Sequence, residues 1–244
     1  MKDSGNLLEI FSSYQGEGVW VGVRQVFVRL SICHLRCVYC DTPESWGASK
    51  TWREEVEPLS QRFEERMNPA SAAEVLRAVE RHAPGAQSVS ITGGEPLVQV
   101  DFLEALLPRL PLPVYLETSG TQSDRLARVA RHVETFSLDF KPPSTPGVRL
   151  DWGDFEACVR IAAGHPAQVK MVVMAETPTP AEVERAADLV RRVDPSIPIV
   201  FTPVTEVNAQ SRAPSPERLG ELRGCVQGLT LHVIPQLHPL VGWH

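Results

Sequence analysis

The stretch VFVRLSICHLRCVYC, residues 26–40, joins an apolar run to three closely spaced cysteines. Val26 to Leu30 is short, apolar and rich in β-branched residues, which predicts a buried strand. Cys33, Cys37 and Cys40 follow directly, in the spacing C-x3-C-x2-C. Thiolates favour soft metals and iron–sulfur clusters, so the stretch predicts a metal-binding loop at the end of a strand.

The number of thiols distinguishes between the metals that this loop could hold. A structural zinc ion normally has four ligands, whereas only three cysteines lie together here. Four-iron clusters usually have four cysteine ligands, so three would leave one iron open to the amino and carboxylate groups of a ligand. Zinc with His34 as fourth ligand is the alternative, although its position beside Cys33 makes a tetrahedral site awkward. Cys158 and Cys225 are isolated and are predicted to be small buried residues.

Strand-like runs recur along the rest of the chain, with helical segments between them. Each is short, rich in apolar and β-branched residues, and flanked by Gly or Pro. After the first, the runs span residues 88–92, 114–117, 136–140, 169–174, 199–201 and 230–234. This alternation predicts a parallel sheet, with fewer strands than the eight of a closed barrel. We expect an α/β fold: a partial, open β/α barrel with a mostly parallel sheet of about six strands.

Helix signals fall between the predicted strands. Ser71 predicts a helix N-cap, with Glu74 at capping-box spacing, and residues 124–132 and 181–193 carry helical periodicity. The polar segment 42–69 is predicted to be an insertion or lid. Neither a repeat nor a second domain is evident, so residues 1–244 are expected to form a single domain.

Composition narrows the class of protein. The formal net charge is −6 and there is no long basic run, so nucleic-acid binding is not expected. No stretch reaches the roughly 18 apolar residues of a membrane helix, and residues 1–10 lack the basic and apolar regions of a signal peptide. We expect a cytoplasmic protein without nucleic-acid or membrane partners, in a compartment that keeps clustered thiols reduced.

Three short motifs sit at the ends of strand-like runs: Thr92-Gly93-Gly94-Glu95-Pro96, Glu117-Thr118-Ser119-Gly120 and Asp139-Phe140-Lys141. Ligands of parallel sheets bind at the carboxyl ends of the strands, so these motifs are expected to share one site. The cysteine spacing, with Tyr39 before the last cysteine, and the Gly-Gly-Glu-Pro segment resemble the radical S-adenosylmethionine superfamily. The resemblance implies a [4Fe–4S] cluster on Cys33, Cys37 and Cys40. It places S-adenosylmethionine against Tyr39, Cys40, Asp41, Gly93, Gly94, Glu95, Ser119, Asp139, Phe140 and Lys141.

Further segments narrow the resemblance. They are residues 11–18, Arg29, Asp41-Thr42, 117–121, 139–143 and 235–238. In this order they resemble the 7-carboxy-7-deazaguanine synthases across essentially the whole chain. The resemblance implies a lyase that converts 6-carboxy-5,6,7,8-tetrahydropterin to 7-carboxy-7-deazaguanine with loss of ammonia, on the route to queuosine and related 7-deazapurines. Residues 239–244 depart from the Trp-Gly-Asn stretch that relatives often carry, so none of them is assigned a role.

The same resemblance implies a substrate site near the first strand. Gln15, with the backbone from Tyr14 to Gly16, would bind the pterin edge, and Thr92 would touch the substrate. Arg29 would pair with the substrate carboxylate, for which its planar fork is suited. The alternatives that remain open are an exposed turn around Gln15 and a structural salt bridge for Arg29.

Thr42 and Lys170 have two interpretations each. The resemblance assigns the Thr42 hydroxyl to Mg²⁺, which prefers oxygen ligands, and the alternative is a helix or turn cap. Lys170 would either point into the barrel or carry an edge charge.

Two other functions remain open at this stage. A glycyl-radical-enzyme activase can share the three-cysteine spacing, and a non-catalytic metal-binding module would need only the thiols. The resemblance further implies a flavodoxin-like electron donor and a homodimer.

Overall fold

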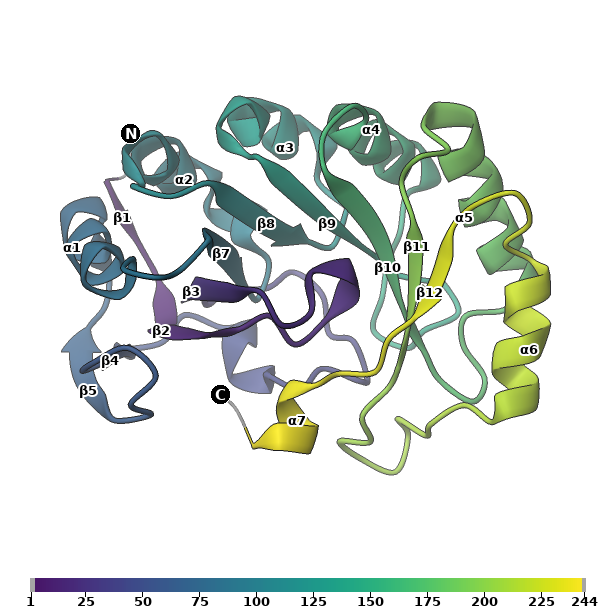
Figure 1. Cartoon of the computed structure of the whole chain (residues 1–244), viewed down its shortest axis with the longest axis horizontal. Helices are drawn as coiled ribbons and strands as arrows, with labels where there is room; N and C mark the ends of the chain where they lie inside the picture. The colour runs from purple at the N-terminus through teal and green to yellow at the C-terminus, as the bar shows by residue number, and fades with distance from the viewer. Residues whose placement is uncertain (1–2, 243–244) are drawn as a thin grey trace.

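The computed structural model describes residues 3–242, within which a curved ten-stranded sheet has helices along its outer side (Figure 1). The strands are β2 (Leu7–Tyr14), β3 (Arg24–Leu30), β4 (Thr51–Glu55), β5 (Phe63–Met67), β7 (Ser88–Gly93), β8 (Val114–Thr118), β9 (Thr135–Phe140), β10 (Ala167–Val173), β11 (Ile199–Pro203) and β12 (Leu231–Val233). A separate two-stranded sheet pairs β1 (Ser4–Gly5) with β6 (Ala70–Ser71). The helices are α1 (Ala72–His82), α2 (Val100–Leu106), α3 (Ser123–Val129), α4 (Trp152–Ala162), α5 (Pro180–Val193), α6 (Pro216–Gly224) and α7 (His238–Val241).

The order of the strands confirms the predicted fold class. It runs β12-β11-β10-β9-β8-β7-β3-β2-β4-β5, and the neighbours from β3 to β12 are all parallel. These parallel strands are the runs that the sequence predicts, within one or two residues at most ends. The sheet is larger than the expected six strands because β2 and a hairpin extend it beyond β3. It stays open, with β12 at one edge and β5 at the other.

The two faces of the parallel strands have different partners. In β10, Val169 and Met171 belong to the hydrophobic core under the helices, whereas Lys170 and Val172 line a cavity on the inner face. Lys170 therefore points into the barrel. Both faces are buried, so polar residues on the inner face must find partners inside the protein.

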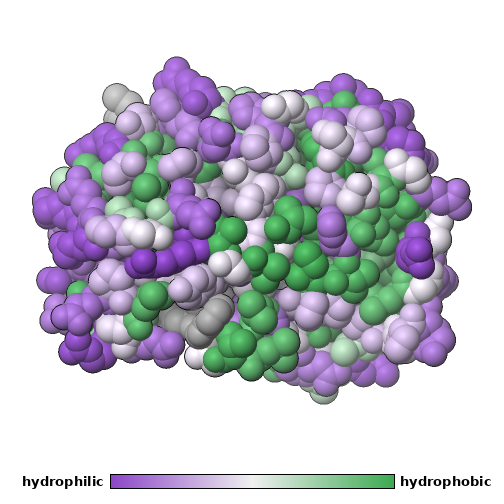
Figure 2. All heavy atoms as spheres, viewed as in Figure 1, coloured by the Kyte–Doolittle hydropathy of each residue, from purple (hydrophilic) through white to green (hydrophobic). Residues whose placement is uncertain are grey.

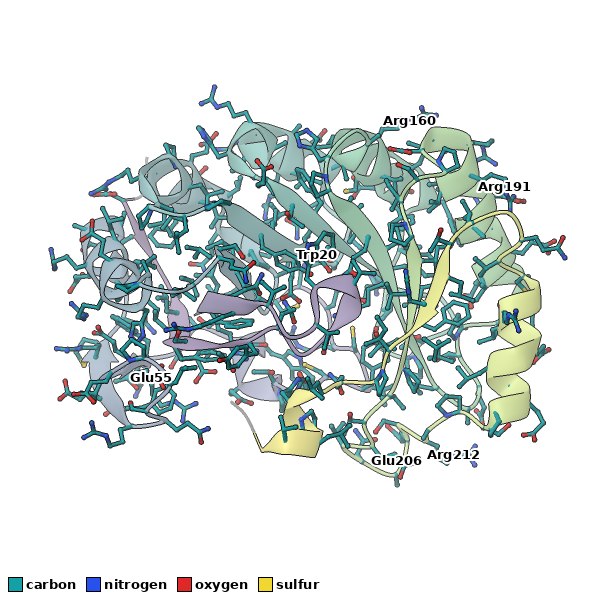
Figure 3. All side chains as sticks on the ribbon, viewed as in Figure 1. Trp20, Glu55, Arg160, Arg191, Glu206 and Arg212 are labelled. Carbon is teal, nitrogen blue, oxygen red and sulfur yellow. The ribbon has the colours of Figure 1, made fainter. Side chains whose placement is uncertain are left out.

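The segment predicted to be an insertion or lid contains a short 3-10 helix, Pro43–Trp46, and the hairpin β4–β5. The hairpin joins the sheet because β4 pairs in parallel with β2. Trp52 is buried in the main core, and Glu55, at the end of β4 beside the hairpin loop (Figure 3), accepts a hydrogen bond from Ser12 N of β2 at 2.8 Å.

The face of the molecule shown in Figure 2 has a hydrophilic rim and an apolar area. In Figure 2 apolar residues gather over the region of β12 and α7, where Val233, Leu240 and Val241 are 49%, 72% and 45% exposed. None of the described helices has the length and apolarity to cross a membrane.

Helix α1 starts as the sequence predicts. Ser71 Oγ accepts a hydrogen bond from Glu74 N, and the Glu74 carboxylate accepts one from Ser71 N at 2.8 Å. The helix then buries Val75 and Val79 in the main core. Thr179 and Glu182 form the same reciprocal box at the start of α5.

We predict that Ser71→Ala lowers the free energy of unfolding by about 1 kcal/mol, because one helix N–H loses its acceptor. Thr179→Ala should lower the free energy of unfolding by a similar amount, since Thr179 and Glu182 form the same kind of capping box. Denaturant unfolding monitored by circular dichroism measures both changes. A loss of only a few tenths of a kcal/mol in both variants would show that the caps contribute little.

Candidate active site

A cavity of about 420 Å³ opens at the carboxyl ends of the parallel strands. Most of the predicted site residues line it: Tyr14, Gln15, Gly16, Arg29, Cys33, Cys37, Tyr39, Cys40, Asp41, Thr42, Thr92, Gly93, Gly94, Ser119, Asp139 and Lys141. Two predicted residues, Glu95 and Phe140, do not. The cavity also has walls to which the sequence analysis gave no role, among them Glu9, Arg53, Glu117, Thr202 and Gln236.

The cysteine loop is held in place by a second loop that precedes α4. Arg36 N donates a hydrogen bond to Gly147 O at 3.0 Å, and Val38 N donates one to Pro146 O at 3.1 Å. Gly147 has φ +82°, and a Cβ there would lie 1.8 Å from Arg36 O. Only glycine permits both this conformation and this contact.

The thiols fit a cluster better than a single zinc ion. A zinc ion with bonds of about 2.3 Å holds its sulfur ligands about 4 Å apart. Among residues 3–242 the only group of three or more candidate ligand side chains with atoms mutually within 4.8 Å is Glu17, Asp41 and His238. The sulfur atoms of the three cysteines are therefore not all within 4.8 Å of one another, and three thiolates without a fourth ligand fit an iron–sulfur cluster better than a structural zinc ion.

Other contacts support the same interpretation. Leu35 N donates to Cys33 Sγ at 3.4 Å, the kind of hydrogen bond that tunes a cluster. Burial raises the pKa of the Cys33 and Cys40 thiols, so a bound metal would have to displace their protons. His34 is engaged elsewhere, since Nε2 lies 2.9 Å from Thr121 Oγ1 and Nδ1 lies 3.1 Å from Gln122 Nε2.

The two isolated cysteines lie outside the cavity. Cys158 is fully buried in the hydrophobic core, as predicted. Cys225 is half-buried at the end of α6, and its thiol donates to Glu221 O at 3.8 Å.

The glycine pair at the end of β7 packs against the cysteine loop. Gly93 has φ +117°, and a Cβ there would lie 2.0 Å from Leu30 O; at Gly94 it would lie 2.6 Å from Ile32 O. Gly94 N donates to Leu30 O at 2.9 Å, and the next residue, Glu95, donates through its N–H to Ile32 O at 3.1 Å. The close approach of two backbones explains the glycines.

Glu95 lies beneath the cavity and organises its wall. Its carboxylate accepts hydrogen bonds from Thr118 Oγ1 at 2.7 Å, from Ser119 N at 2.7 Å and from Ser119 Oγ at 2.5 Å. The side chain of Phe140 is likewise directed away from the cavity, into the core against Phe155. These two residues support the cavity wall from behind.

Buried charges on the inner face are paired. Lys170 forms ion pairs with Glu17 and, at 3.6 Å, with Asp139, whose carboxylate also accepts from Lys141 at 2.7 Å. Burial alone would raise the pKa of Glu17, but the charge and hydrogen bond of Lys170 outweigh it and lower that pKa to about 2. The lysines stay protonated for the same reason: burial would lower the pKa of Lys170, and the neighbouring carboxylates raise it well above its usual value.

Three buried oxygen atoms of the wall have no hydrogen-bond partner among the described residues. They are Tyr39 Oη, Asp139 Oδ1 and Thr202 Oγ1. Buried polar atoms are normally satisfied, so they fit a wall that contacts a ligand with polar groups.

A glutamine and a glutamate form the opposite wall. Gln15 is 3% exposed, and its Nε2 donates to Glu117 Oε1 and to Gln25 Oε1, both at 3.1 Å. Gln15 is thus not part of an exposed turn. Burial raises the pKa of the Glu117 carboxyl, although Lys170 opposes the shift. The sequence analysis did not single out Glu117 as a site residue. The feature that could have identified it is a carboxylate at an inward-facing position of a buried strand.

Arg29 lies at the edge of the same wall. Its Nε donates to Glu9 Oε1 at 2.8 Å, and its guanidinium lies 5.5 Å from the centre of the Phe11 ring. The structural salt bridge considered above therefore exists. It engages Nε alone, and within residues 3–242 neither terminal nitrogen of Arg29 forms a hydrogen bond or ion pair. Arg29 also lines the cavity.

The C-terminal segment crosses the mouth of the cavity. Gln236 Nε2 donates to Glu17 Oε1 at 2.6 Å and to Asp41 Oδ2 at 3.3 Å. Leu237 N donates to Gly16 O at 2.8 Å, and His238 lines the cavity. The last part of the segment 239–244, residues 243 and 244, lies outside the described residues.

We predict that Gly147→Ala displaces the cysteine loop, and Gly164→Ala is the matched control. Both glycines have positive φ, so both substitutions carry a conformational cost of about 1–2 kcal/mol. Only at position 147 would the new Cβ overlap a carbonyl of the cysteine loop, because position 164 has open space around it.

In protein freed of metal, Gly147→Ala should therefore lower the melting temperature more than Gly164→Ala does. It should also speed the reaction of the buried Cys37 thiol with a chromogenic disulfide. Equal melting temperatures and equal thiol rates in the two variants would contradict the steric argument.

Comparison with known proteins agrees with this architecture. The model of the radical SAM superfamily matches residues 28–194. A 7-carboxy-7-deazaguanine synthase of Geobacter sulfurreducens is 39% identical, covering 99% of this chain and 98% of the relative, and one of Methanothermobacter thermautotrophicus is 32% identical, covering 97% and 96%.

Among solved structures, QueE from Escherichia coli shares the fold. It superimposes with a TM-score of 0.58 at 20% identity, over 94% of this chain and 93% of that one. The family model, the full-length relatives and the shared fold agree with one another. The chain belongs to the 7-carboxy-7-deazaguanine synthases of the radical SAM superfamily, whose members use a [4Fe–4S] cluster and S-adenosylmethionine.

Proposed function

We propose that this chain converts 6-carboxy-5,6,7,8-tetrahydropterin to 7-carboxy-7-deazaguanine with loss of ammonia. One observation carries the proposal: a three-thiol loop and a set of side chains suited to a carboxylated pterin open into the same cavity. Gln236 lies across the mouth of the cavity. This favours a small-molecule substrate over the protein substrate of an activase. A metal-binding module would not need the pterin wall.

Cys33, Cys37 and Cys40 would hold the [4Fe–4S] cluster. When bound, the cluster and S-adenosylmethionine together supply the 5′-deoxyadenosyl radical that abstracts a hydrogen atom from the substrate. The wall formed by Gly93 and Gly94 would let the cofactor approach the backbone closely. Other residues proposed to contact the cofactor also line the cavity: Tyr39, Asp41, Ser119, Asp139 and Lys141.

The pterin would lie against the Gln15 wall. An aminopyrimidinone edge presents both hydrogen-bond donors and acceptors, and the Gln15 amide with the Glu117 carboxyl offers both in return. Because both side chains are already fixed by hydrogen bonds, little ordering is needed on binding. Arg29 would bind the substrate carboxylate through the terminal fork that Glu9 leaves available, and Thr92 of the adjacent strand end would contact the ring.

Thr42 would provide one oxygen ligand for Mg²⁺. It stands at the N-cap of the 3-10 helix Pro43–Trp46, but its side chain makes no capping hydrogen bond. The hydroxyl instead donates to Asp41 Oδ1 at 2.9 Å and lines the cavity. Magnesium retains several waters and takes few protein ligands, which suits this partly exposed position.

The assembly and partners are also proposed. Exposed Val233 on the edge strand β12, with Leu240 and Val241 on α7, gives the apolar surface of Figure 2, which would be covered in a homodimer. A flavodoxin-like protein would supply the electron. The five free thiols suit the reducing conditions of the cytoplasm.

The proposed function predicts that reconstituted protein, given S-adenosylmethionine, reductant and the carboxypterin, releases 7-carboxy-7-deazaguanine and ammonia. Cys33→Ala, Cys37→Ala and Cys40→Ala should each abolish the brown cluster absorbance and the product, because two thiolates hold a four-iron cluster poorly. Cys158→Ala is the control and should keep both. Mass spectrometry that finds no deazaguanine with a full cluster would exclude the proposed reaction.

A second prediction concerns Arg29. Arg29→Lys keeps the positive charge but loses the planar guanidinium that can donate two parallel hydrogen bonds to a carboxylate. It should therefore raise the Michaelis constant for the carboxypterin about tenfold or more. Cleavage of S-adenosylmethionine without substrate should remain nearly normal, since Arg29 lies on the pterin wall. A thermal melt checks that the lost Glu9 contact has not unfolded β2. Unchanged kinetics in this variant would remove Arg29 from the substrate site.

A further inference from the structure

The chain between β9 and α4 begins with a segment that we call the support loop, residues 141–148. The carbonyls of Pro146 and Gly147 accept hydrogen bonds from the backbone N–H groups on either side of Cys37, at 3.1 and 3.0 Å. Cys37 itself is 8% exposed, and Val148 packs against the small apolar cluster that contains it. The position of the Cys37 thiol therefore depends on where the support loop lies.

A carboxylate in the first turn of α5 holds the support loop. Glu182 Oε1 accepts a hydrogen bond from Ser144 N at 2.7 Å, and Oε2 accepts one from Ser144 Oγ at 2.6 Å. A longer contact lies beside them, since Thr145 Oγ1 donates to Thr177 Oγ1 at 3.3 Å. Glu182 thus forms the strongest polar link between the support loop and α5.

The same carboxylate also caps α5, and comparison with α1 separates the two tasks. Glu182 Oε2 accepts from Thr179 N at 2.8 Å and from Thr179 Oγ1 at 2.9 Å. Glu74 has the same place in the capping box of α1, and within residues 3–242 its carboxylate accepts hydrogen bonds from Ser71 alone. Capping therefore does not require the contacts with Ser144.

The link through Glu182 is charged and rests on a rigid helix. Burial would raise the pKa of Glu182, but the hydrogen bonds from Ser144 and Thr179 outweigh it and lower that pKa. Hydrogen bonds to an ionised acceptor are stronger than neutral ones, and a helix N-terminus favours negative charge. Helix α5 buries Val183 and Val190 in the main core, so Glu182 ties the support loop to a fixed element.

We propose that Glu182 is a positioning residue for the iron–sulfur cluster: through Ser144 and the support loop it fixes the place of the Cys37 thiolate. The inference deepens the proposed function and rests on its assignment of Cys37 to the cluster. Residues behind a metal ligand commonly orient that ligand and strengthen metal binding. Loss of Glu182 should therefore loosen Cys37 inside a folded protein.

The first test measures how firmly the reconstituted holoprotein keeps its iron. An iron chelator is added, and the loss of cluster absorbance is followed with time. Glu182→Ala should lose the cluster about tenfold faster than wild type. Glu74→Ala is the matched control: it removes the same charge from the same kind of capping box, and it should keep the wild-type rate. Equal acceleration in both variants would overturn the inference, because a lost cap would then explain the effect.

The second test locates the change in the full-length chain without metal. The protein is alkylated for increasing times, and tandem mass spectrometry gives the rate at each cysteine. Glu182→Ala should raise the rate at Cys37 about tenfold, whereas Cys158, which is fully buried in the main core, should keep its wild-type rate. An equal rise at Cys37 and Cys158 would indicate global opening and would overturn the inference.

Two further variants separate the support loop from the helix start, and they decide the question if Glu182→Ala fails to fold. Ser144→Ala removes the 2.6 Å contact and leaves the capping box of α5 intact. Thr179→Ala weakens the box and leaves both contacts of Ser144 in place. Ser144→Ala should speed alkylation of Cys37 and Thr179→Ala should not, and the reverse order would overturn the inference.

The wild-type protein distinguishes failure of this inference from failure of the proposed function. Wild-type protein that assembles the cluster and forms product, together with a Glu182→Ala variant of unchanged chelation and alkylation rates, would overturn this inference alone. Wild-type protein that assembles no cluster would overturn both.

Discussion

The arrangement of the site depends on how closely the end of β7 approaches the cysteine loop. Gly93 and Gly94 lie against the carbonyls of Leu30 and Ile32, at distances that no side chain at either position would permit. This contact fixes where the loop leaves the sheet and therefore where the thiols lie. Glu95 extends the constraint, because its backbone bonds the loop and its carboxylate holds the end of β8. The cysteine loop and the ends of β7 and β8 thus form one rigid unit.

Charge imposes the second constraint on the inner face. Ionised groups are costly to bury unless they are paired, and the lysines of the cavity each have a carboxylate partner. Glu117 differs, because burial raises the pKa of its carboxyl despite the nearby Lys170. Polar groups that face the cavity are therefore largely fixed before any ligand arrives, which reduces the entropy lost on binding.

The sheet divides the two tasks of the site between its parts. Strands β7 to β9 and the cysteine loop form the wall proposed for the cluster and S-adenosylmethionine. Gln15, which follows β2, and Arg29 of β3 form the wall proposed for the pterin and its carboxylate, together with Thr92 of β7 and Glu117 of β8. Such a division agrees with the general separation of scaffold and site in α/β folds.

The sequence alone determined the parallel strands, the α1 capping box and the cysteine loop, because each depends on neighbours close in the chain. It did not determine β2 as a strand, since the adjacent Ser12 and Ser13, which lie on opposite faces, are both buried and blur the alternation. Nor could it orient Lys170, because both faces of β10 are covered. Arg53, Glu9 and Arg29 are separated by 44 and 20 residues and meet only through the register of three strands. Register is set by pairing and packing across the whole sheet, so no local pattern reports it, and only the tertiary structure could bring these charges together.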